Sequence, residues 1–291
     1  MILENKIIDC YEIANKLQND LVIEVQKLQS KNIQPSFATI LVGENPASLV
    51  YVKNKQKKAE LLNINNKMYR LSENISQEEL LDLVNLLNED KEIHGILVQL
   101  PLPSHINSMK IVSSISPKKD IDGLNPLNIG YLSLQNDNGF VPCTPLGCLH
   151  IIKTIEPNLA GKKAVVVGRS NLVGLPMAHL LLNNDATLSI VHSKTKNLAE
   201  ICKQADILVC AIGRPNFINS THIKQGALVV DVGISKIEID GKPKIVGDVN
   251  MESVLPLVSH ITPVPKGVGL LTIMFLMHNI IKSAKQTNMI V

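Results

Sequence analysis

The stretch KAVVVGRSNLVGLP (residues 163–176) joins an apolar strand to a glycine-bounded turn and the start of a helix. Gly168 permits a tight turn and Gly174 permits close helix packing, while the helix N-terminus offers N–H groups and partial positive charge to a phosphate. Ser170 replaces the second glycine of G-x-G-x-x-G, and the last glycine comes one residue late. The motif is therefore a variant, and alone it fits either a dinucleotide site or an ordinary glycine turn.

The residues that follow this turn alternate between helix and strand patterns. We expect helices at about 172–183 and 197–204, and apolar strands at 187–192, 206–213 and 227–235. Such alternation is typical of parallel strands joined by helical crossovers. The sequence thus predicts a Rossmann-like unit over about 160–235, which raises the weight of a dinucleotide site.

The end of the second strand in this unit bears on the choice of cofactor. NAD enzymes usually place an Asp or Glu there, where it accepts from the ribose 2'-hydroxyl. This chain has His192, Ser193 and Lys194 instead, and Arg169 stands in the glycine turn. Because there is no carboxylate at this position to repel a 2'-phosphate, and because Arg169 and Ser193 could bind one, the sequence favours NADP. His192 and Ser193 could equally do no more than end a strand.

The first half of the chain shows the same alternation. We expect helices at 10–28, at about 46–62 and from a Ser76–Glu79 capping box to Asp90, and strands at 37–43, 67–71 and 94–100. A linker-like stretch lies at 131–147, and an apolar helix at 268–284 is expected to pack back on the first half. We predict two α/β domains, each a mostly parallel sheet with helices on both faces: 1–144 with 272–291, and a Rossmann-like domain at 145–271.

Composition excludes several classes of protein. The net charge of +3 comes from 29 basic and 26 acidic residues, which is too balanced for a nucleic-acid-binding protein. Five cysteines form no CxxC pair, so we expect a reducing, cytoplasmic compartment. The sequence has no apolar run of 18 residues and no HxxxH or HExxH spacing, so we expect neither a membrane span nor a metal site.

The first half also offers polar candidates for a site. Tyr51 and Lys55 share one face of the predicted helix with Ser48. Gln99 ends a strand, where ligands of open α/β sheets collect, and Asp122 lies in a loop that ends in glycine. Each alone has an ordinary explanation: an exposed lysine, a strand-end glutamine or a turn aspartate. Only their combination favours a function.

Blocks of sequence that run in order over nearly the whole chain resemble the methylenetetrahydrofolate dehydrogenase/cyclohydrolase family. An ordered set of this kind is far more specific than one glycine motif. The blocks are YVKNK (51–55), GILVQLPLP (95–103), KKDIDGLNPLNIG (118–130), PCTPLG (142–147), GRSNLVGLP (168–176), HSKT (192–195), DVGI (231–234), VGDV (246–249) and ITPVPKGVG (261–269).

The resemblance implies an enzyme of one-carbon metabolism with two reactions. The first is NADP-dependent oxidation of 5,10-methylenetetrahydrofolate to the methenyl cation, and the second is hydrolysis of that cation to 10-formyltetrahydrofolate. Lys55 would then transfer protons, and Gln99 would hold Lys55 by a hydrogen bond. Tyr51 would line the folate slot, and Asp122 would accept from the amino-pyrimidine edge of the pterin.

The resemblance also implies roles in the second half. Residues at the cofactor would be Gly168, Arg169, Ser170, His192, Ser193 and Ile234, and Gly269 and Thr272 would contact the substrate. Lys266 and Leu270 depart from the family's usual PVPGGVGPMT, which puts folate affinity in question. Members of the family are typically homodimers.

Two other readings remain open on the sequence alone. Another Rossmann dehydrogenase, acting on a small hydroxy or amino acid, would explain the second half but not YVKNK together with VQLPLP. A nucleotide-binding module without catalysis would explain only the glycine turn and would bind without turnover.

Overall fold

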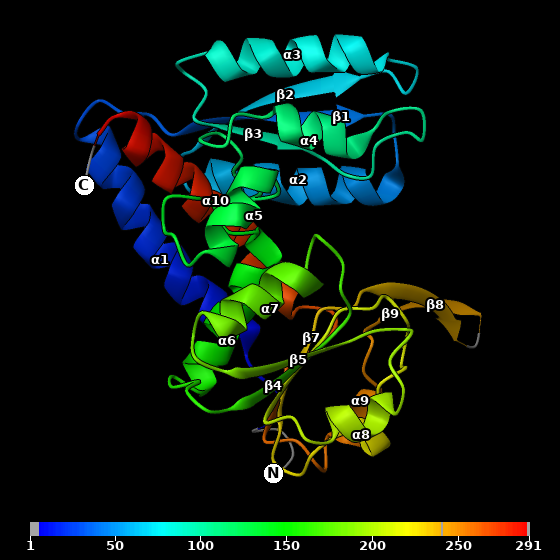
Figure 1. Ribbon diagram of the computed structural model, residues 1–291. Coiled ribbons are helices and arrows are strands. Elements are labelled where there is room, and N and C mark those ends of the chain that lie inside the picture. Colours follow the sequence, from blue (N-terminus) through cyan, green and yellow to red (C-terminus); the bar gives the residue numbers. More distant parts are fainter. Residues whose placement is uncertain (1–5, 240, 290–291) are drawn as a thin grey trace. The chain divides into compact units, whose positions relative to one another are not determined.

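The computed structural model describes residues 6–239 and 241–289 (Figure 1). The chain forms two compact units, which we call unit 1 (Met1–Asn15 and Thr144–Thr272) and unit 2 (Lys16–Cys143 and Ile273–Val291). Residues shortly before Lys16 contact unit 1: Ile8 N donates to Ile261 O at 2.9 Å, and Lys6 Nζ donates to the carbonyls of Leu255 and Pro256.

Unit 1 contains a five-stranded parallel sheet in the order β10-β7-β6-β4-β5. Its strands are β4 (Lys163–Val167), β5 (Thr187–Val191), β6 (Ile207–Cys210), β7 (Leu228–Asp231) and β10 (His260–Ile261), and its short helices include α7 (Gly174–Leu182), α8 (Leu198–Cys202), η2 (Ser220–His222) and α9 (Met251–Val254). The chain turns from β4 outward to β5, then returns to β6 on the other side. The strand order therefore reverses between β4 and β6, which is where doubly wound sheets bind ligands.

The central strands of unit 1, β4, β6 and β7, are buried on both faces. All four residues of β6 and of β7 are buried, as are four of the five in β4. Val165, Val167, Leu208 and Cys210 alternate along two neighbouring strands and pack in one apolar cluster with residues of the α8 and α9 regions. Near-continuous aliphatic strands of this kind suit a parallel sheet covered on both sides, so the predicted Rossmann-like class is confirmed.

Unit 2 is built around a smaller parallel sheet in the order β2-β1-β3. The strands are β1 (Ser36–Val42), β2 (Asn65–Leu71) and β3 (Gly95–Val98), and the helices are α2 (Pro46–Leu61), α3 (Gln77–Glu89), α4 (Ser108–Ser114) and α5 (Pro126–Ser133). Figure 1 shows α2 and α3 on opposite faces of this sheet. Here too the order reverses, between β1 and β3, so unit 2 has a ligand position of its own.

Local signals explain where the helices of unit 2 begin. Asn45 Oδ1 accepts from the first free N–H groups of α2, and Pro46 lies at the first helical position. The capping box predicted for α3 is confirmed, because Ser76 Oγ accepts from Glu79 N while the Glu79 carboxylate accepts from Ser76 N. On the face of β1 toward α3, Ala38, Ile40 and Val42 pack against α3.

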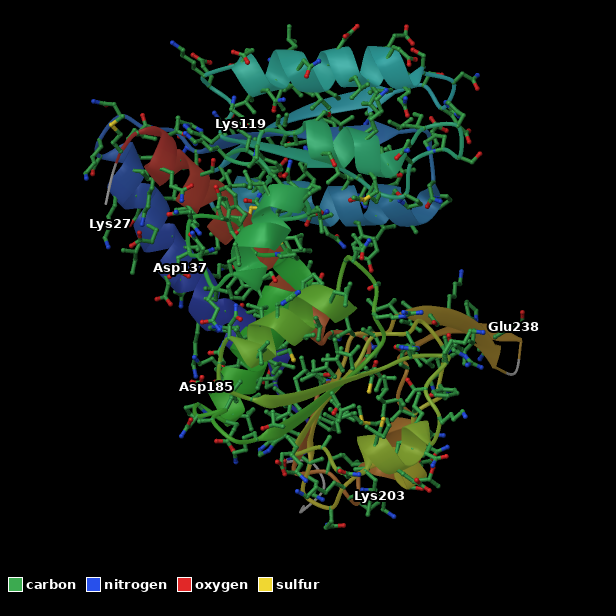
Figure 2. The ribbon with its side chains drawn as sticks, in the orientation of Figure 1. Lys27, Lys119, Asp137, Asp185, Lys203 and Glu238 are labelled. Carbon is green, nitrogen blue, oxygen red and sulfur yellow. The ribbon has the colours of Figure 1, made fainter. Side chains whose placement is uncertain are left out.

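The last helix, α10 (Val268–Thr287), starts in unit 1 and continues into unit 2. Its unit 2 part packs on the first sheet region as predicted, because Ser283 Oγ donates to the carbonyls of His94 and Lys118. Lys285 also pairs with Glu24 on α1 (Cys10–Gln29). Lys119, labelled in Figure 2, donates to Leu87 O and Asp90 O. It thereby attaches the loop between α4 and α5 to the end of α3.

The predicted linker at 131–147 is partly helical. It contains the last residues of α5 and the start of α6 (Cys143–Ile155). The stretch therefore contains helix ends rather than a free linker: Leu134 is the C-cap of α5, and Pro142 directly precedes the first residue of α6. The antiparallel hairpin of β8 (Ser235–Ile239) and β9 (Lys242–Val246) was also not predicted.

Candidate active site

Lys55 lies on the buried face of α2. That face carries residues at spacings of four, three and four, namely Ser48, Val52, Lys55 and Ala59. Only 9% of the Lys55 surface is exposed. A lysine is almost never buried without a partner. Its position therefore calls for a polar group that the fold brings to it.

Gln99 is that partner, at 3.0 Å from Lys55 Nζ to Gln99 Oε1. The glutamine is itself oriented, because its Nε2 donates to Leu100 O at 2.7 Å and its backbone N donates to Ile40 O at 2.9 Å. The amide oxygen is thus turned toward Lys55. The pair stands where β1 and β3 end side by side, at the reversal of strand order in unit 2.

Tyr51 is at the edge of this buried face rather than on it. It lies one helical turn before Lys55 and is 41% exposed, whereas Ser48 is buried. An aromatic ring exposed one turn from a buried cation can cover a flat ligand. The three residues predicted to share a face therefore differ in exposure.

The loop of Asp122 is fixed by its neighbour Asp120. The Asp120 carboxylate is 1% exposed and accepts from Asn125 N at 2.7 Å and from Asn128 Nδ2 at 2.8 Å. Burial raises the pKa of Asp120 to about 6, although these hydrogen bonds oppose the rise. Asp122 itself is half-buried. One aspartate of the pair therefore builds the loop, and the other is available to a ligand.

Lys55 and Asp122 both act on the thiol of Cys143. Burial raises the pKa of Cys143 well above its usual value, and Asp122 raises it further, while Lys55 lowers it. A side chain that feels both charges lies close to both. The structure thus brings Lys55, Gln99 and Asp122 into one region, together with Cys143, which we had not singled out from the sequence.

The glycine turn of unit 1 has no room for larger residues. Gly168 has a φ of +116°, and a Cβ there would lie 2.2 Å from Ala211 O on the neighbouring strand connection. A Cβ on Gly174 would lie 2.4 Å from Gly168 O. Ser170 Oγ accepts from Val173 N and Gly174 N at the start of α7. The glycines therefore allow the close backbone approach that a diphosphate cradle requires, and it lies at the β4–β6 reversal.

The His192–Thr195 turn lies beside this cradle. Val167 pairs with Val191, so the residues after each strand are neighbours. The turn is closed by Thr195, whose N donates to His192 O and whose Oγ1 accepts from His192 N. Ser193 is exposed, as is Arg169 on the adjacent turn. A cation and a hydroxyl thus face solvent together, which suits a phosphate on the ribose.

Two buried aspartates shape the next strand ends. Asp248, fully buried, accepts backbone N–H groups from Ile212, Gly213 and Arg214 after β6. Asp231 accepts from three further backbone N–H groups, and burial raises its pKa to about 6. The sequence blocks DVGI and VGDV contain these aspartates, but their role in holding the loops was not predicted.

The remaining predicted residues lie at the end of unit 1. Ile234 is 52% exposed, directly after the loop that Asp231 holds. Thr272 Oγ1 lies 3.1 Å from Thr144 Oγ1, and Gly269 precedes it on α10. Of the four predicted substrate residues, Gly269 and Thr272 therefore belong to unit 1, and Tyr51 and Asp122 to unit 2.

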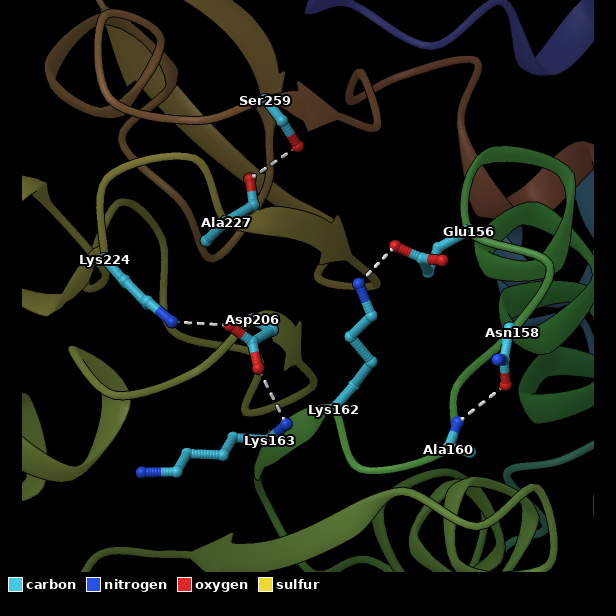
Figure 3. Close-up of polar contacts among 9 residues, drawn as sticks. All are labelled: Glu156, Asn158, Ala160, Lys162, Lys163, Asp206, Lys224, Ala227 and Ser259. Atoms are coloured by element: carbon cyan, nitrogen blue, oxygen red, sulfur yellow. Dashed lines mark hydrogen bonds and ion pairs between the residues drawn. The ribbon is translucent and has the colours of Figure 1, made fainter.

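A hollow of about 310 Å³ lies at the N-terminal ends of strands β4, β6 and β7, away from the glycine turn that follows β4. Its charged lining residues form ion pairs: Lys162 pairs with Glu156 at 2.6 Å, and Asp206 pairs at 2.5 Å with Lys224, which lies outside the lining (Figure 3). We assign no binding role to it. Its lining residues are Ile155, Glu156, Lys162, Asp206, Ile207, Gly226, Leu228, Ser259 and His260.

Among residues 6–239 and 241–289, no three His, Cys, Asp or Glu side chains converge as metal ligands would. Over the same residues, no helix has the length and apolar character that a bilayer crossing requires.

Comparison with known proteins gives matches over both units. Residues 8–122 match the model of the tetrahydrofolate dehydrogenase/cyclohydrolase catalytic domain, and residues 142–288 match that of its NAD(P)-binding domain. The bifunctional protein FolD of Wolbachia pipientis from Culex pipiens is 50% identical over 96% of this chain and 95% of its own.

Solved structures agree. The FolD crystal structure from Campylobacter jejuni has a TM-score of 0.92 at 50% identity, covering 96% of this chain and 98% of that one. The Trypanosoma brucei enzyme, complexed with NADP cofactor and inhibitor, has a TM-score of 0.92 at 37% identity, covering 97% and 98%. Another dehydrogenase or a nucleotide-binding module without catalysis is therefore not favoured.

Proposed function

The chain belongs to the tetrahydrofolate dehydrogenase/cyclohydrolase family, and we propose that Lys55, Gln99 and Asp122 carry its folate chemistry. The activity is NADP-dependent oxidation of 5,10-methylenetetrahydrofolate followed by hydrolysis of 5,10-methenyltetrahydrofolate. The observation that carries the assignment of residues is the bond from buried Lys55 to Gln99 at the strand reversal of unit 2.

The two reactions place different demands on the protein. In the oxidation, the bridging carbon between N5 and N10 loses a hydride, which NADP accepts when it is bound. In the hydrolysis, water adds to the resulting cation, the bond from carbon to N5 breaks, and N10 keeps the formyl group. Oxidation needs mainly orientation, whereas hydrolysis needs protons to move.

Lys55 is suited to move those protons. One proton leaves the attacking water and one arrives at N5 as the ring opens, so a group with mobile protons must lie beside the carbon. Lys55 Nζ carries three donor positions, of which Gln99 engages one. Gln99 fixes the direction of the remaining ones.

Asp122 and Tyr51 are suited to hold the pterin. The amino-pyrimidine edge presents a fork of N–H donors, and a carboxylate with two oxygens matches that fork. Asp122 is half-buried in a loop that other residues hold. Tyr51, exposed on α2, offers a flat ring to the bicyclic ligand.

The cofactor residues act through backbone shape and charge. Gly168 and Gly174 make the cradle for the diphosphate, and Ser170 shapes the turn between them. Arg169, Ser193 and His192 would recognise the 2'-phosphate, and Ile234 would face the nicotinamide. Gly269 and Thr272 remain proposed substrate contacts.

A coupled assay tests the activity. Purified protein is mixed with methylenetetrahydrofolate and NADP, and reduced cofactor, methenyl product and 10-formyl product are followed together. We expect reduced cofactor to form and the methenyl product to be converted onward, with NAD as the matched comparison. Absence of cofactor reduction with both nucleotides would contradict the proposal.

We also propose that the chain forms a homodimer in the cytoplasm. β5 is an edge strand with Ser189 and Ile190 exposed, and an edge can pair with another copy. All five cysteines are free and buried, which fits a reducing compartment. Light scattering of the purified protein should give twice the mass of one chain, and Ile190→Lys should lower this measured mass. A wild-type mass equal to one chain would reject the dimer.

Cell fractionation tests the proposed compartment.

A further inference from the structure

Asn279 is a polar residue buried in the part of α10 that belongs to unit 2. Only 1% of its surface is exposed. Its Nδ2 donates to Ile121 O at 2.9 Å and to Val141 O at 3.2 Å. A buried amide normally uses its donors, but here both go to carbonyls more than 130 residues away in the sequence.

The Ile121 carbonyl belongs to the peptide bond that leads into Asp122. The same oxygen also accepts from Cys143 Sγ at 3.3 Å, so two donors fix the plane of that peptide. Because the peptide is rigid, its plane fixes the positions of the N and Cα atoms of Asp122, from which the side chain extends. Asn279 thus holds the carbonyl of the residue directly before Asp122, which is the proposed pterin-binding carboxylate.

The second acceptor makes Asn279 a clamp between two segments. A Cβ on Gly123 would lie 2.5 Å from the Val141 carbonyl carbon, so the loop after Asp122 already packs against the 141–143 segment. Asn279 bonds one carbonyl in each segment and holds them at this distance. The Asp120 carboxylate, by contrast, accepts from Asn125 and Asn128, which come from its own stretch of chain.

The amide is itself held firmly. One turn further along α10, Ser283 donates to His94 O and Lys118 O, and Lys282 donates to Gly139 O at 2.7 Å. The helix is therefore attached on both sides of the Asp122 loop. Loss of the Asn279 amide alone would leave the Ile121 carbonyl with the weaker thiol donor of Cys143, while the helix keeps its other attachments.

We propose that Asn279 is a positioning residue for folate recognition, acting through the Ile121–Asp122 peptide on the carboxylate that binds the pterin. The inference rests on the proposed function, since it takes Asp122 as the pterin contact. Two oxygens that meet a planar fork of donors tolerate little rotation, so a freed peptide weakens binding.

The test substitutes Asn279→Leu, which keeps the volume and removes both donors. Binding of tetrahydrofolate is measured by calorimetry, and we expect the Kd to rise by roughly tenfold, as for loss of a buried hydrogen bond. The Kd for NADP should stay within a factor of two, as should kcat at saturating folate. A fall in kcat with unchanged folate Kd would overturn the inference.

A matched control and a double mutant separate positioning from folding. Ser283→Ala also removes buried bonds of α10, and it should lower the unfolding temperature without changing the folate Kd. In an Asp122→Ala background, Asn279→Leu should have almost no further effect on folate binding, because its target is gone. Effects that multiply in the double mutant would show a structural role alone and would reject the inference.

Two further outcomes are distinguishable. If wild-type protein binds tetrahydrofolate but turns over no methylenetetrahydrofolate, the proposed activity fails while the binding cycle still decides the role of Asn279. If Asn279→Leu does not fold, Asn279→Ser removes one of two donors, and a smaller rise in Kd that vanishes in the Asp122→Ala background supports the inference. No rise in Asn279→Ser rejects it.

Discussion

Lys55 differs from the other lysines of α2 in its surroundings rather than in its chemistry. Lys53 and Lys57 are exposed, whereas Lys55 is buried against an oriented glutamine. An exposed lysine moves among many rotamers, but a buried one with a fixed partner keeps its ammonium group at one place. Catalysis needs that fixed place more than it needs another positive charge.

Replacement of Lys55 should separate the two reactions. We expect Lys55→Ala to abolish hydrolysis of methenyltetrahydrofolate and to reduce the oxidation less, because only hydrolysis depends on proton transfer at the bridging carbon. Absorbance of the methenyl product measures both. Lys57→Ala, exposed on the same helix, is the matched control and should retain both activities. Hydrolysis at the wild-type rate in Lys55→Ala would refute the assignment.

Arg169 should determine the preference between the two nicotinamide cofactors. Arg169→Ala removes an exposed cation beside the His192–Thr195 turn, so we expect the Kd for NADP to rise on the order of tenfold, while that for NAD changes little. Fluorescence titration of both nucleotides measures this. Lys196→Ala, a nearby exposed cation, serves as control. An equal rise in the Kd for NADP and for NAD would contradict a role of Arg169 in binding the 2'-phosphate.

Lys266 has a backbone conformation that favours glycine. Its φ is +72°, and its side chain is exposed. A left-handed conformation costs an L-residue about 1–2 kcal/mol, which the extra freedom of glycine in the unfolded chain offsets only in part. Lys266→Gly should therefore raise the free energy of unfolding by about 0.5–1 kcal/mol in urea denaturation. Lys244→Gly in strand β9 should instead lower it, and a loss in Lys266→Gly would contradict the expectation.

At the scale of elements, the loop between α4 and α5 depends on a carboxyl group that is costly to ionise. Asp120 is buried and accepts hydrogen bonds that stabilise its charge, yet burial dominates and holds its pKa at about 6. An unfolded aspartate ionises near pH 4. The folded loop therefore binds a proton that the unfolded chain has already released.

This shift gives Asp120 a pH dependence of known sign. Ionised Asp120 destabilises the fold above pH 6. This cost is relieved as pH falls through about 6 toward 4, so Asp120 makes the folded protein more stable in acid than at neutral pH. Asp120→Asn keeps an acceptor oxygen and cannot titrate. From pH 7.5 to 4.5, wild type should gain on the order of 2 kcal/mol relative to the variant in urea denaturation.

The variant comparison is necessary because a histidine works in the opposite direction. Burial lowers the pKa of His94, so its neutral form is favoured in the fold and stability is lost as pH falls below about 6.5. The difference between wild type and Asp120→Asn cancels that contribution. A difference that does not change with pH would show that Asp120 is protonated, or ionised, equally in both states.

The elements that the sequence predicts are those with their own local signals. The capping box of α3 and the periodicity of α1 specify these helices without help from the rest of the chain. The short helix α4 has seven residues and one cap, Asn107, which is too little pattern to separate it from a turn. Its stability comes from packing of Ile111 and Val112, which only the fold supplies.

At the scale of the molecule, each ligand should protect its own unit from hydrogen exchange. NADP should slow exchange around Gly168–Gly174 and Ser193, and tetrahydrofolate should slow it around Tyr51–Lys55 and Asp122, because each group lies at the strand reversal of a separate sheet. Mass spectrometry of peptides measures this, with Arg169→Ala as the control for NADP. Protection of residues 51–55 alone by NADP would contradict the assignment.

The site was predictable where its residues form motifs and unpredictable where the fold alone unites them. Lys55, Gln99 and Asp122 each stand in a recognisable block, although their contacts remained to be seen. Asn279, by contrast, stands outside every one of these blocks. Asn279 lies 158 residues from Ile121 in the sequence, and no periodicity or spacing links positions so far apart.

Neither unit is a single continuous piece of chain. Unit 1 needs its opening residues and the segment up to Thr272, and unit 2 needs the segment from Ile273 onward, including Asn279 and Ser283. A ribosome releases the chain from the N-terminus, at roughly 5–20 residues per second. The first sheet is thus synthesised long before the part of α10 that packs against unit 2. Chaperones that bind nascent chains would meet this protein with its apolar faces still uncovered.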